Sequence, residues 1–127
     1  MRAACAIVLS LVGTNAPSAA CLKANTDDQV TQGRLTSVRV VDEAYERTEH
    51  AYILQLKEPA CLDGSEDLYD KVEKTDRIHV FAFEAPLSQR LKRFVGKNVV
   101  VQGSPFGEHT AHHHAPIVMR ISKIDPL

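Results

Sequence analysis

The sequence predicts a small, mainly β barrel, and three features of the 127-residue chain carry that prediction. Short runs of alternating apolar and polar residues recur along the chain, which is typical of strands with one buried face. Only one stretch, which starts at Pro86, has the spacing of a helix. A chain of this length supports one hydrophobic core and therefore one domain.

Five strands are expected, and they cover residues 29–42, 52–57, 78–83, 97–103 and 117–124. In the first run the parity of the apolar positions changes between Leu35 and Val38, which predicts a bulge near Thr36 and Ser37 and a bent strand. The third run is apolar at both parities, so it should be covered on both faces. The polar segment 62–77 is expected to be an excursion between the second and third strands.

One helix is expected between the third and fourth strands. Pro86 suits a first helical turn, and Leu87, Leu91 and Phe94 recur at helical spacing. Basic residues near the end of this segment suit the helix dipole, and Gly96 just past it suits a left-handed cap. Three strands, a helix and two strands match the five-stranded Greek-key barrel called the OB-fold.

In an OB-fold, the loops that join strands one to two and four to five flank the ligand-binding face. Here these loops are expected at residues 42–50 and 104–116. The second loop holds four of the six histidines of the chain, which are His109, His112, His113 and His114. Imidazole titrates near neutral pH and commonly ligates metals, so the sequence places its candidate site in this loop.

The start of the chain is predicted to be an export signal rather than part of the fold. Arg2 supplies a positive charge, residues 3–12 an apolar run, and Ala19 and Ala20 the small residues that precede a cleavage site. The apolar run is too short for a transmembrane helix, which needs roughly 20 apolar residues. We therefore expect a signal peptide at 1–20 and a periplasmic or secreted domain at 21–127, without a transmembrane segment.

Cleavage after Ala20 would leave two cysteines, Cys21 and Cys61. In an oxidising compartment such a pair is expected to form a disulfide, which stabilises a fold by about 3 to 4 kcal/mol on the chain-entropy model. A lipid anchor on Cys21 is the alternative, but Ser18 stands where a lipoprotein signal prefers leucine. The two fates of Cys21 exclude each other, and the disulfide is the favoured prediction.

Four segments carry a family resemblance: Gly96–Gly103, the His-Thr-Ala-His-His-His-Ala-Pro run of residues 109–116, Cys21–Leu22, and Leu56-x-x-Pro59-x-Cys61. Together they resemble an uncharacterised domain family of secreted bacterial proteins, a domain of unknown function. Ala111 stands where that resemblance leads us to expect glycine. The family has no established activity, so the resemblance implies an exported OB-like barrel and leaves the function open.

Metal binding is the first functional hypothesis for the histidine segment. His112 and His114 would point the same way in an extended segment, and clustered neutral imidazoles suit zinc or copper. The candidate ligands are His109, His112 and His114, together with His50, Glu46 or Glu108. The alternative is that the histidines satisfy the backbone of a polar loop without any metal.

A periplasmic protein-binding module, such as an inhibitor or immunity protein, is the second hypothesis. Small disulfide-linked exported domains often act in this way, and the acidic first loop offers a contact patch around an aromatic side chain. The residues assigned to partner binding are Tyr45, Glu46, Glu49, Glu108 and His113.

A metal-dependent hydrolase is the least favoured hypothesis. Glu108 or Glu49 could serve as its general base, but the sequence lacks a His-Glu-x-x-His pair, a Gly-x-Ser-x-Gly elbow, a P-loop and a Gly-x-Gly-x-x-Gly run. Binding of single-stranded nucleic acid typically requires a basic groove with aromatic side chains on which the bases stack. The chain has a formal net charge of −1 and only four Phe and three Tyr, so the sequence argues against a nucleic-acid partner.

Overall fold

The computed structural model describes residues 21–64 and 68–127, and the predicted signal peptide at 1–20 lies outside them. The elements in chain order are β1 (Leu22–Lys23), β2 (Gln29–Asp42), η1 (Glu43–Tyr45), β3 (Arg47–Asp63), η2 (Leu68–Asp70), β4 (Val72–Phe81), α2 (Ala85–Phe94), β5 (Asn98–Gly107) and β6 (Ile117–Pro126). Within the described part of the chain, no helix is long and apolar enough to cross a membrane.

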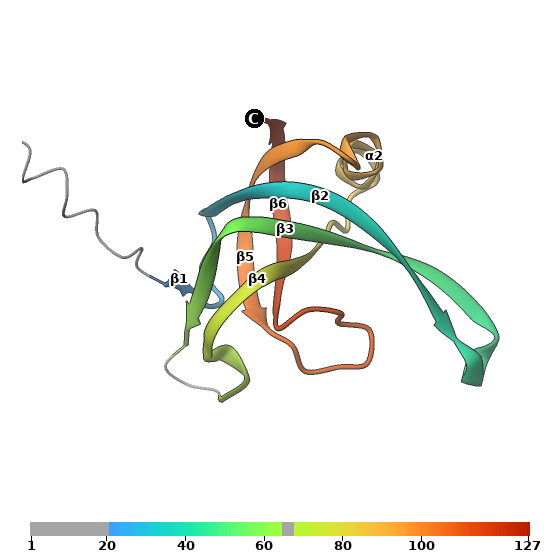
Figure 1. Cartoon of the computed structure of the whole chain (residues 1–127), viewed down its shortest axis with the longest axis horizontal. Helices are drawn as coiled ribbons and strands as arrows, with labels where there is room; N and C mark the ends of the chain where they lie inside the picture. The colour runs from blue at the N-terminus through green and yellow to red at the C-terminus, as the bar shows by residue number, and fades with distance from the viewer. Residues whose placement is uncertain (1–20, 65–67) are drawn as a thin grey trace, which may run out of the picture.

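Five strands close into a barrel in the order β3-β2-β5-β6-β4, with β4 pairing back onto β3 (Figure 1). The β4–β6 pair is parallel, and the other pairs of the barrel are antiparallel. This order, with the helix between β4 and β5, is that of the OB-fold, so the predicted fold class is confirmed. The short strand β1 was not expected from the sequence, and it lies parallel to the end of β3.

Alternate residues of the strands fill the interior of the barrel. The core residues with at most 1% of their surface exposed are Leu35, Leu54, Ile78, Val80, Leu91, Val99, Val101, Ile117, Met119 and Ile124. Leu91 joins this core from α2, whose C-terminal end carries the predicted left-handed Gly96 at φ 91°. Each fully buried aliphatic side chain stabilises the folded state by about 1.5–3 kcal/mol relative to an exposed one. The core therefore fixes the strands from which the loops extend.

β2 and β3 continue beyond the barrel as a two-stranded ribbon, which we call the hairpin arm and define as residues 36–50 (Figure 1). β5 pairs with β2 from Gln29 to Arg34, and β4 reaches β3 only as close to the tip as Tyr52. The arm turns through η1, after which Glu46 adopts a positive φ of 52°. The segment predicted as a charged loop is therefore largely strand.

The bulge predicted near Thr36 and Ser37 is wrong, because β2 keeps one continuous register on β3 from Gly33 to Asp42. The apolar parity changes because two different surfaces bury the strand. Leu35 points into the barrel core, whereas Val40 lies on the outer face of the sheet. There it packs against a small cluster, which we call the outer cluster and which consists of Ala51, Ile53 and Ala115.

The disulfide between Cys21 and Cys61 is confirmed, with a Cα–Cα distance of 4.6 Å. It ties the start of the described chain to the C-terminal end of β3. The excursion predicted at 62–77 is shorter than expected, because β3 runs to Asp63 and β4 starts at Val72. Between them η2 ends at Asp70, whose carboxylate accepts hydrogen bonds from the Gly107 N–H at 3.0 Å and from Asn25 Nδ2 at 2.9 Å.

Candidate functional site

The connection between β5 and β6 is the histidine loop, which we define as residues 108–116. It starts later than predicted, because β5 continues to Gly107. The Glu108 N–H donates to the Pro116 carbonyl at 3.0 Å and closes the base of the loop. Ala115 is 2% exposed in the outer cluster, so the loop folds back over the outer face of β3. This is the side on which OB barrels customarily bind ligands.

The central side chain beneath the loop is His79 of β4, which is 9% exposed. It lies opposite Ile53 in the β3–β4 register and therefore shares the outer face. Its Nδ1 accepts the backbone N–H of His114 at 3.3 Å, and the two ring centroids are 5.4 Å apart. Sequence reasoning missed His79 as a site residue, although a histidine in an otherwise apolar strand was the available signal.

The pKa of His79 is lowered from 6.5 to about 4, mainly by burial and to a smaller extent by the neighbouring His114 and His113, while Glu49 acts in the opposite direction. The ring is therefore neutral at pH 7. Because Nδ1 accepts a hydrogen bond, the single ring proton is on Nε2.

His113 also accepts a hydrogen bond from a backbone N–H of the loop. Its Nδ1 accepts the backbone N–H of His109 at 3.2 Å, and its ring lies 5.3 Å from the Phe106 ring centroid. Desolvation lowers the pKa of His113, and His109 lowers it further, whereas Glu108 raises it. The two histidines that serve as backbone acceptors match the metal-free interpretation of the loop.

An aromatic row supports the loop from below. Phe106 of β5 contacts the rings of His109 and Phe81, with centroid distances of 5.6 Å and 6.3 Å. His109 also lies 6.2 Å from Tyr69 of η2, at the outer end of the row. These contacts hold His109 against β5 and η2.

His112 and Glu49 connect the loop to the hairpin arm. The distance between His112 Nδ1 and Glu49 Oε1 is 3.4 Å, and both side chains are partly open to solvent. The backbone N–H of His112 donates to Thr110 Oγ1 within the loop at 3.2 Å. The structure thus brings together one predicted candidate ligand and one predicted partner-binding residue.

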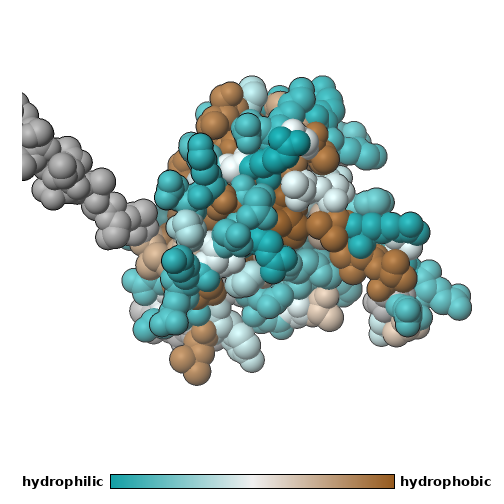
Figure 2. Space-filling view, in the orientation of Figure 1, coloured by the Kyte–Doolittle hydropathy of each residue, from teal (hydrophilic) through white to brown (hydrophobic). Residues whose placement is uncertain are grey.

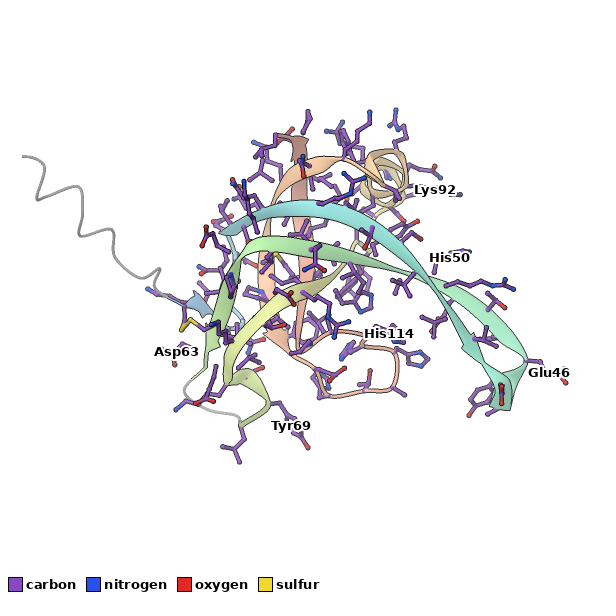
Figure 3. All side chains as sticks on the ribbon, viewed as in Figure 1. Glu46, His50, Asp63, Tyr69, Lys92 and His114 are labelled. Carbon is purple, nitrogen blue, oxygen red and sulfur yellow. A yellow bond between two sulfur atoms is a disulfide. The ribbon has the colours of Figure 1, made fainter. Side chains whose placement is uncertain are left out.

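Two other predicted ligands, His50 and Glu46, lie apart from this contact. His50 follows Glu49 in β3 and so points to the opposite face of the strand, and Figure 3 shows it away from His114. Glu46 lies at the tip of the arm (Figure 3). Across residues 21–64 and 68–127, no group of three or more His, Cys, Asp or Glu side chains is placed to hold a metal ion. Metal binding by the loop therefore stays a prediction.

A groove of about 590 Å³ lies between the hairpin arm and the histidine loop. The residues that line it are Val40, Val41, Glu43, Tyr45, Glu49, Ala111 and His112. Tyr45 is 75% exposed and Val41 is 58% exposed, so both apolar surfaces are accessible to another molecule. The arm and the loop correspond to the two loops that flank an OB ligand site.

Fold and site together define a class of protein: a small disulfide-linked OB-like barrel whose outer face at β3 and β4 is covered by its own histidine loop. Residues 77–125 match a family described as a domain of unknown function, DUF4431. The matched segment contains His79 and the whole histidine loop, and it supports the similarity to an uncharacterised domain family. No curated protein matches the chain.

Proposed function

We propose that this protein is an exported, non-enzymatic binding module that holds a protein partner in the groove between the hairpin arm and the histidine loop. The groove itself is the observation that carries the proposal. Export rests on the signal-like composition of residues 1–20.

The lining of the groove indicates the chemistry of the partner. Tyr45 offers a large amphipathic side chain of the kind that anchors protein interfaces, and Val40 and Val41 supply apolar surface beside it. Glu43 and Glu49 add two carboxylates, and neither lysine nor arginine is among the lining residues. A partner segment that presents a basic side chain next to an apolar one fits this surface.

Site-specific photo-crosslinking in producing cells tests the proposal. A photoreactive phenylalanine analogue at Tyr45 should capture a protein partner. The same analogue at Tyr69, which is 61% exposed and lies outside the groove, is the matched control. The captured partner, once purified, should bind Glu49→Gln at least about fivefold more weakly than wild type, because a charge-assisted contact is lost. Equal capture at both positions, or none at Tyr45, would refute the proposal.

A transition-metal site is a second candidate, and the 3.4 Å contact between His112 and Glu49 favours it. A useful site needs at least one more ligand, which His109 or His114 could provide after a shift of the loop. His79 and His113 offer no lone pair in this conformation, because Nδ1 is engaged and Nε2 carries the proton. Calorimetric titration with zinc and copper tests whether the loop binds metal, and His112→Ala/His114→Ala should bind more weakly than wild type. Equal binding by both proteins would eliminate this candidate.

A further inference from the structure

The hairpin arm leaves one edge of β2 without a neighbouring strand. β5 pairs with β2 as far as Arg34, and two further backbone hydrogen bonds join Leu35 to the segment after α2. From Thr36 to Asp42, β2 pairs with β3 alone among the described strands. The space-filling view shows brown, hydrophobic surface along the arm at the right of the molecule (Figure 2).

The backbone groups that face this edge follow from the alternation of an antiparallel ladder. The Leu35 N–H donates to the Lys97 carbonyl at 2.9 Å, and the Leu35 carbonyl accepts from the Gly96 N–H at 2.7 Å, so Leu35 directs its backbone away from β3. The register on β3 is continuous, so Ser37, Arg39 and Val41 direct theirs the same way. Their N–H and C=O groups form a row that the backbone of another strand fits.

The side chains along the edge also favour another strand. Val38 is 44% exposed and Val41 is 58% exposed, and β-branched residues are enriched in strands. Protected edges usually carry proline, a bulge or several charges. Between Thr36 and Val41 this edge has a regular register and a single charge, Arg39.

We propose that this edge of β2 pairs with the same edge of a second copy of the chain. An antiparallel pairing about a two-fold axis at Val38 places Val38 opposite Val38 of the second copy. It also places Ser37 opposite Arg39, and these residues direct their hydrogen-bonding groups toward each other. A register centred on Arg39 is excluded, because it sets two like charges directly opposite.

The charge distribution along the arm supports an antiparallel pair. Its tip carries Glu43 and Glu46, and Figure 3 shows Glu46 at the far end of the ribbon. The other end of the arm, which we call its root, lies beside the C-terminal end of α2 and the segment after it. Lys92, Arg93 and Lys97 make this region basic. Two antiparallel arms bring each acidic tip toward the basic root of the other copy, and the attraction weakens as salt is added.

Sedimentation velocity of the disulfide-bonded protein over a concentration series tests the pairing. We expect a monomer–dimer equilibrium. Arg39→Pro removes an N–H that faces the free edge and spares the ladder to β3, so it should raise the dimer dissociation constant at least about tenfold. Thr48→Pro is the matched control: Thr48 lies opposite Val41 and directs its N–H to the other edge of the arm, and its effect should stay within about twofold.

Cysteine cross-linking provides a test that does not require a proline variant to fold. Cys21 and Cys61 are joined, so Val38→Cys adds an unpaired thiol at the proposed two-fold axis. Directly opposite residues of a non-hydrogen-bonded pair have Cβ atoms about 4.5–5.5 Å apart, which allows a disulfide after small adjustments. Oxidation should give a covalent dimer, whereas Val30→Cys, on the part of β2 that β5 covers, should not. Equal cross-linking at both positions, or a wild-type protein that stays monomeric at millimolar concentration, would overturn the proposal.

Discussion

The backbone N–H of His114 donates to Nδ1 of His79 across 3.3 Å, and this bond ties the histidine loop to the sheet beneath it. The acceptor exists only while the imidazole is neutral, because a protonated ring carries hydrogen on both nitrogens. The contact between loop and barrel is therefore sensitive to acid.

Acidification should destabilise the protein through His79. Its pKa is lowered from 6.5 to about 4 in the folded state, so the unfolded chain binds more protons than the folded one between these two pH values. The contribution of His79 to the free energy of unfolding is therefore fully present above pH 6.5. It falls as the pH drops toward 4, by about 3 kcal/mol in total. Urea unfolding at pH 7.5, 6.5, 5.5 and 4.5 measures this change.

The matched variants separate His79 from the other histidines. His79→Asn keeps an acceptor near the position of Nδ1 but does not titrate, so most of the loss between pH 6.5 and 4.5 should disappear. His50→Asn removes a histidine from the opposite face of β3 and should keep the wild-type pH dependence. If both variants lose stability with pH as steeply as wild type, His79 is not the responsible group.

The barrel was predictable from the sequence because strand alternation, the single helix and Gly96 are local signals. The shape of the arm was not, because alternation shows that a face is buried and not what buries it. The parity change after Leu35 therefore suggested a bulge, whereas it marks the point where the outer cluster replaces the core. The extension of β2 and β3 past their neighbours depends on long-range pairing that no local pattern encodes.

The candidate site was predictable in position and not in composition. The sequence indicated the histidine loop and a lone histidine in the apolar run 78–83, but no local pattern showed that His79 lies beneath the loop. Residues 42–50 were expected to form a loop, so the opposite directions of Glu49 and His50 were not expected either. Ala111 is not among the described non-glycine residues with positive φ, which are Asn25, Asp28 and Glu46. The turn therefore does not need the glycine that the family resemblance suggested.

Loss of the disulfide should destabilise the fold by about 3 to 4 kcal/mol, because Cys21 and Cys61 close a long loop whose entropy is then regained by the unfolded chain. Urea unfolding of Cys21→Ser/Cys61→Ser against wild type measures the difference. A free-thiol assay on unreduced, denatured protein that starts at Cys21 should find no thiol. Two titratable thiols would contradict the pairing.

Gly107→Ala should destabilise the protein by about 2 to 3 kcal/mol, within the range for overpacking a tight site. A Cβ at this position would collide with the backbone carbonyl of Tyr69 and push η2 away from β5. The hydrogen bond from the Gly107 N–H to Asp70 would then be strained. Thermal unfolding checks the cost, and Lys74→Ala on the exposed side of β4 is the control, with an expected change within about 0.5 kcal/mol.

Ala115→Asp should release the histidine loop and leave the barrel folded. Ala115 is 2% exposed against Ala51 and Ile53, and an unpaired carboxylate buried there would cost several kcal/mol. Lifting the loop returns that charge to water and breaks the bond between His114 and His79, so the amide of His114 should exchange at least about tenfold faster. Ala111→Asp is the matched control, because Ala111 is an exposed alanine of the same loop, and its effect should stay within about twofold. Core amides such as those of Leu54 and Val101 should remain protected in both variants. Should Ala115→Asp expose these core amides together with His114, the loop and the barrel unfold as one unit, and the loop is part of the core rather than a cover laid over it.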